Sequence, residues 1–248
     1  MTQTLVIGGI SAADVTTNVN ATFDGILTAA TTGNLALTKA GLGRQILTGA
    51  SRYTGATTIS SGSLIVNGSL ANTAVTVAGG ATLGGTGFIG NTLGGSVTVT
   101  GGAAAASRGV IDLTTNTAIG TLSLSTSGTG NALTLGGTAG NAAVLNFDIA
   151  NTTTDRIDIL GSARLLVSAG GAIINLTQLA GTPLAAGIYP LITFSSATNT
   201  GSFTVGTGFL GGWTLNQSSS ALQLVTGGAA LNFSETILED LLHCREKG

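Results

Sequence analysis

Three aspartates between residues 148 and 158 are the first candidates for chemistry in this chain. Asp148, Asp155 and Asp158 form an acidic cluster in a sequence with few charges. Two carboxyl groups about 5 to 9 Å apart can hydrolyse a glycosidic bond. Arg156 lies between two of them, however, and an ion pair at a corner of the fold would explain the cluster equally well. The ion pair is the interpretation we favour.

His243 and Cys244 are the only other pair with nucleophilic potential. A nucleophile and its base must converge on one point, whereas neighbouring residues on a helix point about 100° apart. The chain also lacks a Gly-x-Ser-x-Gly elbow and a phosphate-binding Gly-Lys-Ser/Thr loop. The glycine run at Gly84 has no aspartate where a calcium-binding repeat needs one. We therefore expect no enzyme, no cofactor and no metal site.

Composition excludes further classes of function. Charged residues make up 7% of the 248 residues and the formal net charge is −2, so no basic face for nucleic acid can form. No apolar run approaches the roughly 18 residues of a membrane helix, and we expect no membrane insertion of this segment. The single cysteine, Cys244, excludes an internal disulfide.

The elements that would position any site are short strands at a regular spacing. Pairs of apolar residues two positions apart recur mostly every 11 to 14 residues, and each pair places both side chains on one face of a strand. The pairs are Leu64/Val66, Val75/Val77, Val97/Val99, Ile111/Leu113, Leu122/Leu124, Leu133/Leu135, Leu145/Phe147 and Ile157/Ile159. Such periodicity predicts a parallel β-solenoid over residues 1–228. At about 22 residues a coil, this means about ten coils and a rod of roughly 50 Å.

Residues 183–225 differ by their larger side chains. This stretch holds half of the chain's aromatic residues, namely Tyr189, Phe194, Phe203, Phe209 and Trp213. We interpret it as a denser last part of the core. A groove beside Trp213 that binds or cleaves carbohydrate, together with Asp148, Asp155 and Asp158, is the alternative.

Residues 229–248 have the composition of an amphipathic α-helix. Ser234 suits the N-cap, acidic Glu235 suits the first turn, and Arg245 and Lys247 suit the last. The apolar residues of this tail form a candidate end-cap or interaction face: Phe233, Ile237, Leu238, Leu241 and Leu242. Three interpretations remain open: a cap on the last coil, a connector to another chain, or a non-native extension.

Residues 47–66 closely resemble the autotransporter-associated β-strand repeat. The segment reads Leu-Thr-Gly-Ala-Ser-Arg-Tyr-Thr-Gly-Ala-Thr-Thr-Ile, and it departs from the family pattern mainly at Ser51, where asparagine is usual. The resemblance extends over roughly residues 23–226. It implies an all-β, right-handed parallel β-helix from a bacterial surface or secreted protein, and it implies no particular activity.

These observations lead to one expected function and two alternatives. We expect a non-enzymatic, structural or adhesive solenoid scaffold of an autotransporter passenger domain, extracellular or at the cell surface. Met1 to Thr4 carry no basic residue, so no signal peptide is predicted and the chain would be part of a larger exported protein. The alternatives are a self-assembling extracellular fibre subunit that stacks through open solenoid ends, and a carbohydrate-binding or carbohydrate-active β-helix. Expected partners are the chain itself, a surface glycan or a protein ligand.

Overall fold

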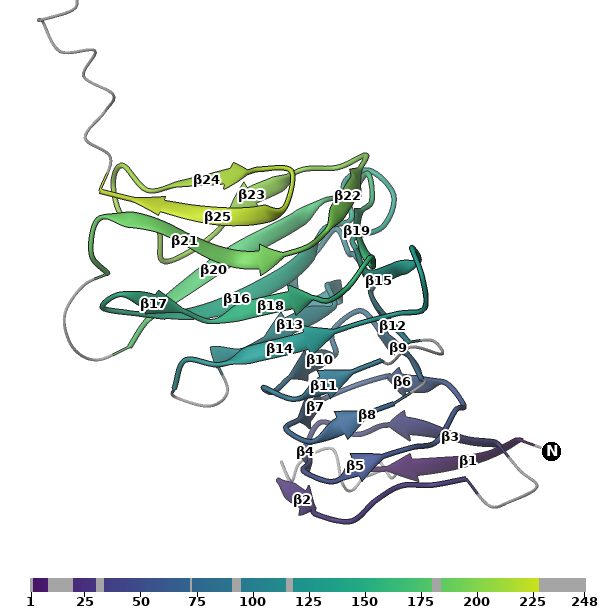
Figure 1. Cartoon of the computed structure of the whole chain (residues 1–248). Helices are drawn as coiled ribbons and strands as arrows, with labels where there is room; N and C mark the ends of the chain where they lie inside the picture. The colour runs from purple at the N-terminus through teal and green to yellow at the C-terminus, as the bar shows by residue number, and fades with distance from the viewer. Residues whose placement is uncertain are drawn as a thin grey trace, which may run out of the picture.

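Three sheets wind around one elongated core in the computed structural model of this chain (Figure 1). The structure describes residues 2–8, 20–29, 34–71, 73–90, 95–114, 118–179 and 184–227. Strand follows strand from sheet to sheet, and nearly all pairings within a sheet are parallel. The predicted parallel β-solenoid is confirmed.

Each sheet takes one strand from each coil. The first sheet consists, in order, of β1 (Thr2–Ile7), β3 (Asn34–Lys39), β6 (Thr57–Ile59), β9 (Ala74–Val77), β12 (Ser96–Val99), β15 (Asn131–Leu135), β19 (Arg164–Val167) and β22 (Ser196–Asn199). The second sheet consists of β2 (Ala21–Phe23), β4 (Arg44–Leu47), β7 (Ser63–Val66), β10 (Thr82–Gly84), β13 (Val110–Asp112), β16 (Ala143–Ala150), β20 (Ala172–Gln178) and β23 (Phe203–Val205), with β17 (Thr153–Thr154) beside β16.

The third sheet is parallel until its last two strands. It consists of β5 (Ala50–Ser51), β8 (Ser69–Leu70), β11 (Phe88–Ile89), β14 (Thr121–Leu124), β18 (Arg156–Ile159), β21 (Gly187–Thr193), β25 (Ala221–Thr226) and β24 (Thr214–Gln217). β25 pairs antiparallel with both β21 and β24. The winding therefore ends in a hairpin.

Continuous columns of side chains form the core. One inner column passes through all eight strands of the first sheet in register: Leu5, Leu37, Thr57, Val75, Val97, Leu133, Leu165 and Ala197. Every apolar pair singled out in the sequence is buried. Alternate residues of these strands, such as Thr76 and Thr98, face outward, so each coil buries its apolar face only against its neighbours.

The coils are fewer and less uniform than predicted. Leu37, Thr57, Val75 and Val97 follow one another at 20, 18 and 22 residues, whereas the steps from Val97 to Leu133 and to Leu165 take 36 and 32. The longer coils hold a 3-10 turn at Ala105–Ser107 and the hairpin between β16 and β17. The sheets accordingly stack eight levels instead of about ten. The column then spans roughly 35 Å rather than roughly 50 Å.

An antiparallel hairpin covers the end of the core that lies opposite β1 (Figure 1). Leu222 and Leu224 of β25 are buried, and Phe203, Phe209 and Trp213 pack half-buried against the core. Of the five aromatic residues predicted to enlarge the core, Phe194 is the one that is fully enclosed, at 4% exposure. The segment is thus mainly an end cover and not the densest part of the core.

The predicted helical tail, residues 229–248, lies outside the described residues. Within the described ranges the chain contains no α-helix, and none of its helical segments is long and apolar enough to cross a membrane.

Candidate functional site

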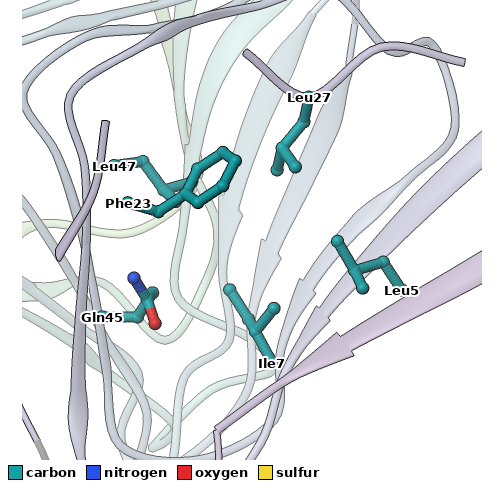
Figure 2. A pocket seen from close by; sticks show the side chains of 6 residues that line it. All are labelled: Leu5, Ile7, Phe23, Leu27, Gln45 and Leu47. Carbon is teal, nitrogen blue, oxygen red and sulfur yellow. The ribbon is translucent and has the colours of Figure 1, made fainter. Parts of the chain in front are cut away.

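An apolar hollow of about 240 Å³ lies at the end of the core that the first coil forms. Figure 2 shows the six side chains arranged around it, with the ring of Phe23 projecting inward. They come from the first two levels of the first two sheets and from the segment after β2: Leu5, Ile7, Phe23, Leu27, Gln45 and Leu47. We call this hollow and its lining the mouth.

Among the described residues, no further coil lies over the inner columns at the first level. Leu5 is only half-buried, whereas Leu37, its partner one level on, is fully buried. Phe23 is 39% exposed and its ring lies over Gly25, which has no side chain to displace it. Val6, on the outer face of β1, is 45% exposed. Apolar surface of this kind is costly to leave in water.

Two of the strand edges at the mouth are also open. β1 and β2 each stand at the end of their sheet order, with a neighbour on one side within the described residues. The outer side of β5 is covered by the segment after β2, because Arg52 N–H donates to the carbonyl of Leu27 at 2.8 Å and Leu27 N–H donates to Ser51 Oγ at 3.2 Å. β1 has no charged residue, proline or bulge to discourage pairing with another chain. Solenoids and other sheet proteins usually block such edges, so the mouth combines exposed apolar side chains with exposed backbone hydrogen-bonding groups.

Lys39 borders the mouth and is a buried charge that the sequence reasoning missed. It takes an inner-column position between Ile7 and Ile59 and is 1% exposed. Its Nζ donates to the carbonyls of Ala40 at 2.7 Å, Gly41 at 2.9 Å and Ser61 at 3.3 Å. Burial lowers the pKa of Lys39. The signal was present, because Lys39 continues the alternation of Leu35 and Leu37.

The segment that carries the family resemblance serves the interior. Tyr53 is fully buried, and its hydroxyl lies 2.6 Å from Thr57 Oγ1. Thr57 Oγ1 lies 2.8 Å from Thr73 Oγ1, which donates to the carbonyl of Gly55 at 2.7 Å. Burial raises the pKa of Tyr53 to about 12. This closed network satisfies each hydroxyl and leaves none for a ligand.

Asp155 is a structural carboxyl group inside the corner after β17. It is fully buried and accepts hydrogen bonds from the backbone N–H groups of Gly120 and Asp148, both at 2.7 Å. Burial outweighs these bonds and raises the pKa of Asp155 to about 7. The side chain therefore ties β16, β17 and the start of β14 together.

Asp148, on β16, is 1% exposed. Within the part of the chain that the structure describes, neither of its carboxyl oxygens has a hydrogen-bond partner. Burial, and secondarily the negative charge of Asp112, raises its pKa. A buried carboxyl without partners favours the neutral acid.

Asp158 belongs to a different sheet and forms the predicted ion pair with Arg156. Arg156 Nη2 donates to Asp158 Oδ2 at 2.7 Å and Nε lies 2.6 Å from Oδ1, while Thr193 Oγ1 donates to Oδ1 at 2.7 Å. Asp158 is thus occupied by Arg156 and Thr193 on β18 and β21. Asp155 lies beside Asp148, because the backbone N–H of Asp148 donates to its carboxyl group.

Trp213 packs on the end of the core, and its backbone N–H donates to the carbonyl of Leu210. It lines neither the mouth nor a second, smaller hollow of about 100 Å³ between Thr152, Arg156 and Tyr189. Among the described residues no group of three or more His, Cys, Asp or Glu side chains is placed to hold a metal ion.

Seven of the residues discussed for the tail lie outside the described residues. They are the predicted interaction residues Phe233, Ile237, Leu238, Leu241 and Leu242, and the pair His243 and Cys244.

A comparison with protein families identifies one segment of the chain. The family model described as passenger-associated-transport-repeat matches residues 37–66. This stretch runs from Leu37 on β3 to Val66 on β7, about one and a half coils, and it contains Tyr53, Gly55 and Thr57. The segment is therefore a repeat of the autotransporter passenger type, in agreement with the resemblance of residues 47–66. No curated protein matches the chain.

Proposed function

We propose that this chain is a non-enzymatic solenoid scaffold of an autotransporter-like passenger, which presents its outer faces outside the cell. The passenger-associated repeat at residues 37–66 supports an exported surface protein. The observation that carries the scaffold role is the unbroken inner column from Leu5 to Ala197. Such a stack supplies length and stability and needs no prosthetic group.

The placement of the polar residues supports a role without catalysis. The carboxyl group of Asp155 accepts hydrogen bonds from two backbone N–H groups. That of Asp158 accepts hydrogen bonds from Arg156 and Thr193. A glycosidase would instead need two carboxyl groups facing a shared cleft that admits a sugar. The hydroxyls of Tyr53, Thr57 and Thr73 bond to one another and to the backbone.

The test of this proposal is a glycan array and a panel of polysaccharides, probed with the full chain and with Trp213→Ala and Asp158→Asn. We expect no hydrolysis by any of the three proteins and no array signal that depends on Trp213. Glycan binding lost in Trp213→Ala, or hydrolysis lost in Asp158→Asn, would replace the scaffold with a carbohydrate-directed function.

A further inference from the structure

The outer face of the first sheet carries threonine in one continuous column. From β3 to β15, five successive strands place a threonine at the same outward position, each in register with the next. The five residues are Thr38, Thr58, Thr76, Thr98 and Thr134. Neighbouring strands of a sheet are about 4.8 Å apart, so the hydroxyl and methyl groups of this column repeat at that distance over roughly 19 Å (Figure 1).

Small, uncharged side chains flank the column on both sides. Two positions before or after a threonine lie Ala36, Ala56, Ala74, Ser96, Ala40, Ser60, Ala78 and Thr100. The backbone N–H groups of Ser60, Ala78 and Thr100 donate to the preceding level, so the ladder continues beyond the strands. We call the five threonines and these flanking residues the threonine face.

The threonine face differs from the outer faces of the other two sheets. The described first-sheet strands from β1 to β15 contain no aromatic residue, and their one charged residue, Lys39, is buried. The second sheet instead carries Arg44 and Asp112 at outward positions, and the third carries Arg156 and Asp158. A regular, uncharged array is therefore specific to one side of the solenoid.

The hydroxyls of the column are available to water. Thr76 is exposed and the other four threonines are half-buried between their neighbours. Within the described residues, none of the five hydroxyls has a hydrogen-bond partner. Each can donate one hydrogen bond and accept two. Because a β-branched side chain is stiff at χ1, the backbone largely fixes where its hydroxyl and methyl groups lie.

Charge complementarity and spacing select the partner of this face. A surface without charges attracts no ionic ligand, and a surface without aromatic rings offers no stacking platform for a sugar. Water suits both kinds of group present, because it bonds to the hydroxyls and forms an ordered shell around the methyl groups. The repeat of about 4.8 Å is close to the oxygen repeat along the a axis of hexagonal ice. Waters held at successive levels can therefore belong to one ice lattice.

We propose that the threonine face binds ice. Waters bonded to successive hydroxyls and ordered around the methyl groups form a layer that merges with the crystal. Ordering a water at a protein surface costs up to about 2 kcal/mol, but water in ice is already ordered. Ice between adsorbed molecules must then grow with a curved surface, which lowers its freezing point below its melting point. This inference goes beyond the scaffold role proposed above and does not depend on it.

The experiment measures thermal hysteresis, the difference between the melting and freezing temperatures of one ice crystal in a solution of the full chain. We expect hysteresis with faceted crystals, and slower growth of ice grains than in serum albumin of equal mass concentration. Thr76→Lys, which places a charge at the centre of the column, should reduce the hysteresis at least threefold. Thr82→Lys is the matched control, because Thr82 is a half-buried, outward residue of the same coil in the second sheet. It should leave the hysteresis unchanged.

Thermal melts followed by circular dichroism show whether each variant keeps the fold, and Thr98→Lys repeats the test one level further on. A folded, unmodified chain that shows neither hysteresis nor an effect on grain growth would overturn the proposal. Equal losses in Thr76→Lys and Thr82→Lys would also overturn it, because the contact with ice would not lie on this face. Light scattering tests another occupant: a dimer of the unmodified chain that Thr76→Lys abolishes would assign the face to pairing between two copies instead.

Discussion

At the residue scale, most buried polar side chains of the described residues bond to one another or to the backbone, and Asp148 is an exception. Tyr53, Gly55 and Thr57 were recognisable as a family signature, and the structure gives the physical reason for each. The ring of Tyr53 fills the interior, and its hydroxyl is hydrogen-bonded to the hydroxyl of Thr57. Gly55 lies against the backbone of Leu35. The burial of Lys39 escaped sequence reasoning, because lysine is rarely enclosed and its three carbonyl partners lie at a corner no pattern specifies.

Gly55→Ala tests the close contact in the repeat signature. A Cβ at this position would collide with the carbonyl group of Leu35. Since that backbone belongs to the neighbouring coil, we expect a loss of about 1–3 kcal/mol in the free energy of unfolding. The measurement is urea unfolding followed by circular dichroism. Gly211→Ala, where an added Cβ meets no atom within 4 Å, is the matched control and should change the midpoint little.

Asp155 predicts a pH dependence of stability. Its pKa rises from 3.8 to about 7 on folding, so the folded state binds the proton more tightly. The corresponding stability is fully present below about pH 3.8 and is lost as the pH rises through about 7. We expect the melting temperature to fall by several degrees between pH 5 and pH 8.

Asp155→Asn separates this effect from other titrations. The amide oxygen can accept only one of the two backbone N–H groups fully, so the variant should be less stable than the parent at pH 5. Its melting temperature should nevertheless change less between pH 5 and pH 8. An equal decrease in both proteins would mean that Asp155 is not the titrating group.

At the element scale, the strands were predictable and the corners were not. The apolar pairs located strands such as β9, β12 and β14 because alternation depends only on residues within the strand. The length of a coil depends on its corners. Strands that follow corners of different length still pair in the same register, as Val97, Leu133 and Leu165 do. The hairpin of β24 and β25 left a signal in the run of serines 218–220 between two alternating segments, which would have suggested a turn.

Two insertions test the difference between corner and strand. A Gly-Ser insertion after Gly128 adds residues where a Cβ would meet no neighbour, and we expect a change in unfolding free energy below about 0.5 kcal/mol. One alanine inserted after Thr98 in β12 would move Val99 from the inner to the outer face. We expect loss of cooperative unfolding, measured by thermal melts. Similar thermal melts for the two insertion variants would contradict the register that places Val99 of β12 on the inner face.

At the scale of the whole molecule, stability comes from contacts between adjacent coils, and the two ends differ. Sequence reasoning anticipated open ends but looked for a cap in the tail, since an amphipathic pattern is more visible than a reversal of strand direction. Among the described residues, β25 and the aromatic side chains lie over the last coil, whereas Leu5, Ile7 and Phe23 are only partly covered at the first. The tail lies outside the described residues, so its role as a cap stays a prediction.

Amide hydrogen exchange should show this difference between the ends. The residues of β1 and β2 are mostly exposed, whereas those of β16 and β20 are mostly enclosed and paired on both sides. Local opening requires less free energy where fewer contacts break. We expect exchange at least a hundredfold faster in β1 and β2 than in β16 and β20, read by mass spectrometry at low protein concentration. Uniform protection would indicate one cooperative unit.

Two nearly identical strands at the centre of the first sheet, β9 and β12, have a genetic consequence. Val75, Thr76 and Val77 of β9 lie directly beneath Val97, Thr98 and Val99 of β12, and one coil of 22 residues joins them. A tandem duplication of the codons for that coil would therefore supply another complementary layer and lengthen the rod by about 4.8 Å. Unequal recombination could in this way change the reach of the molecule without the invention of any new interface.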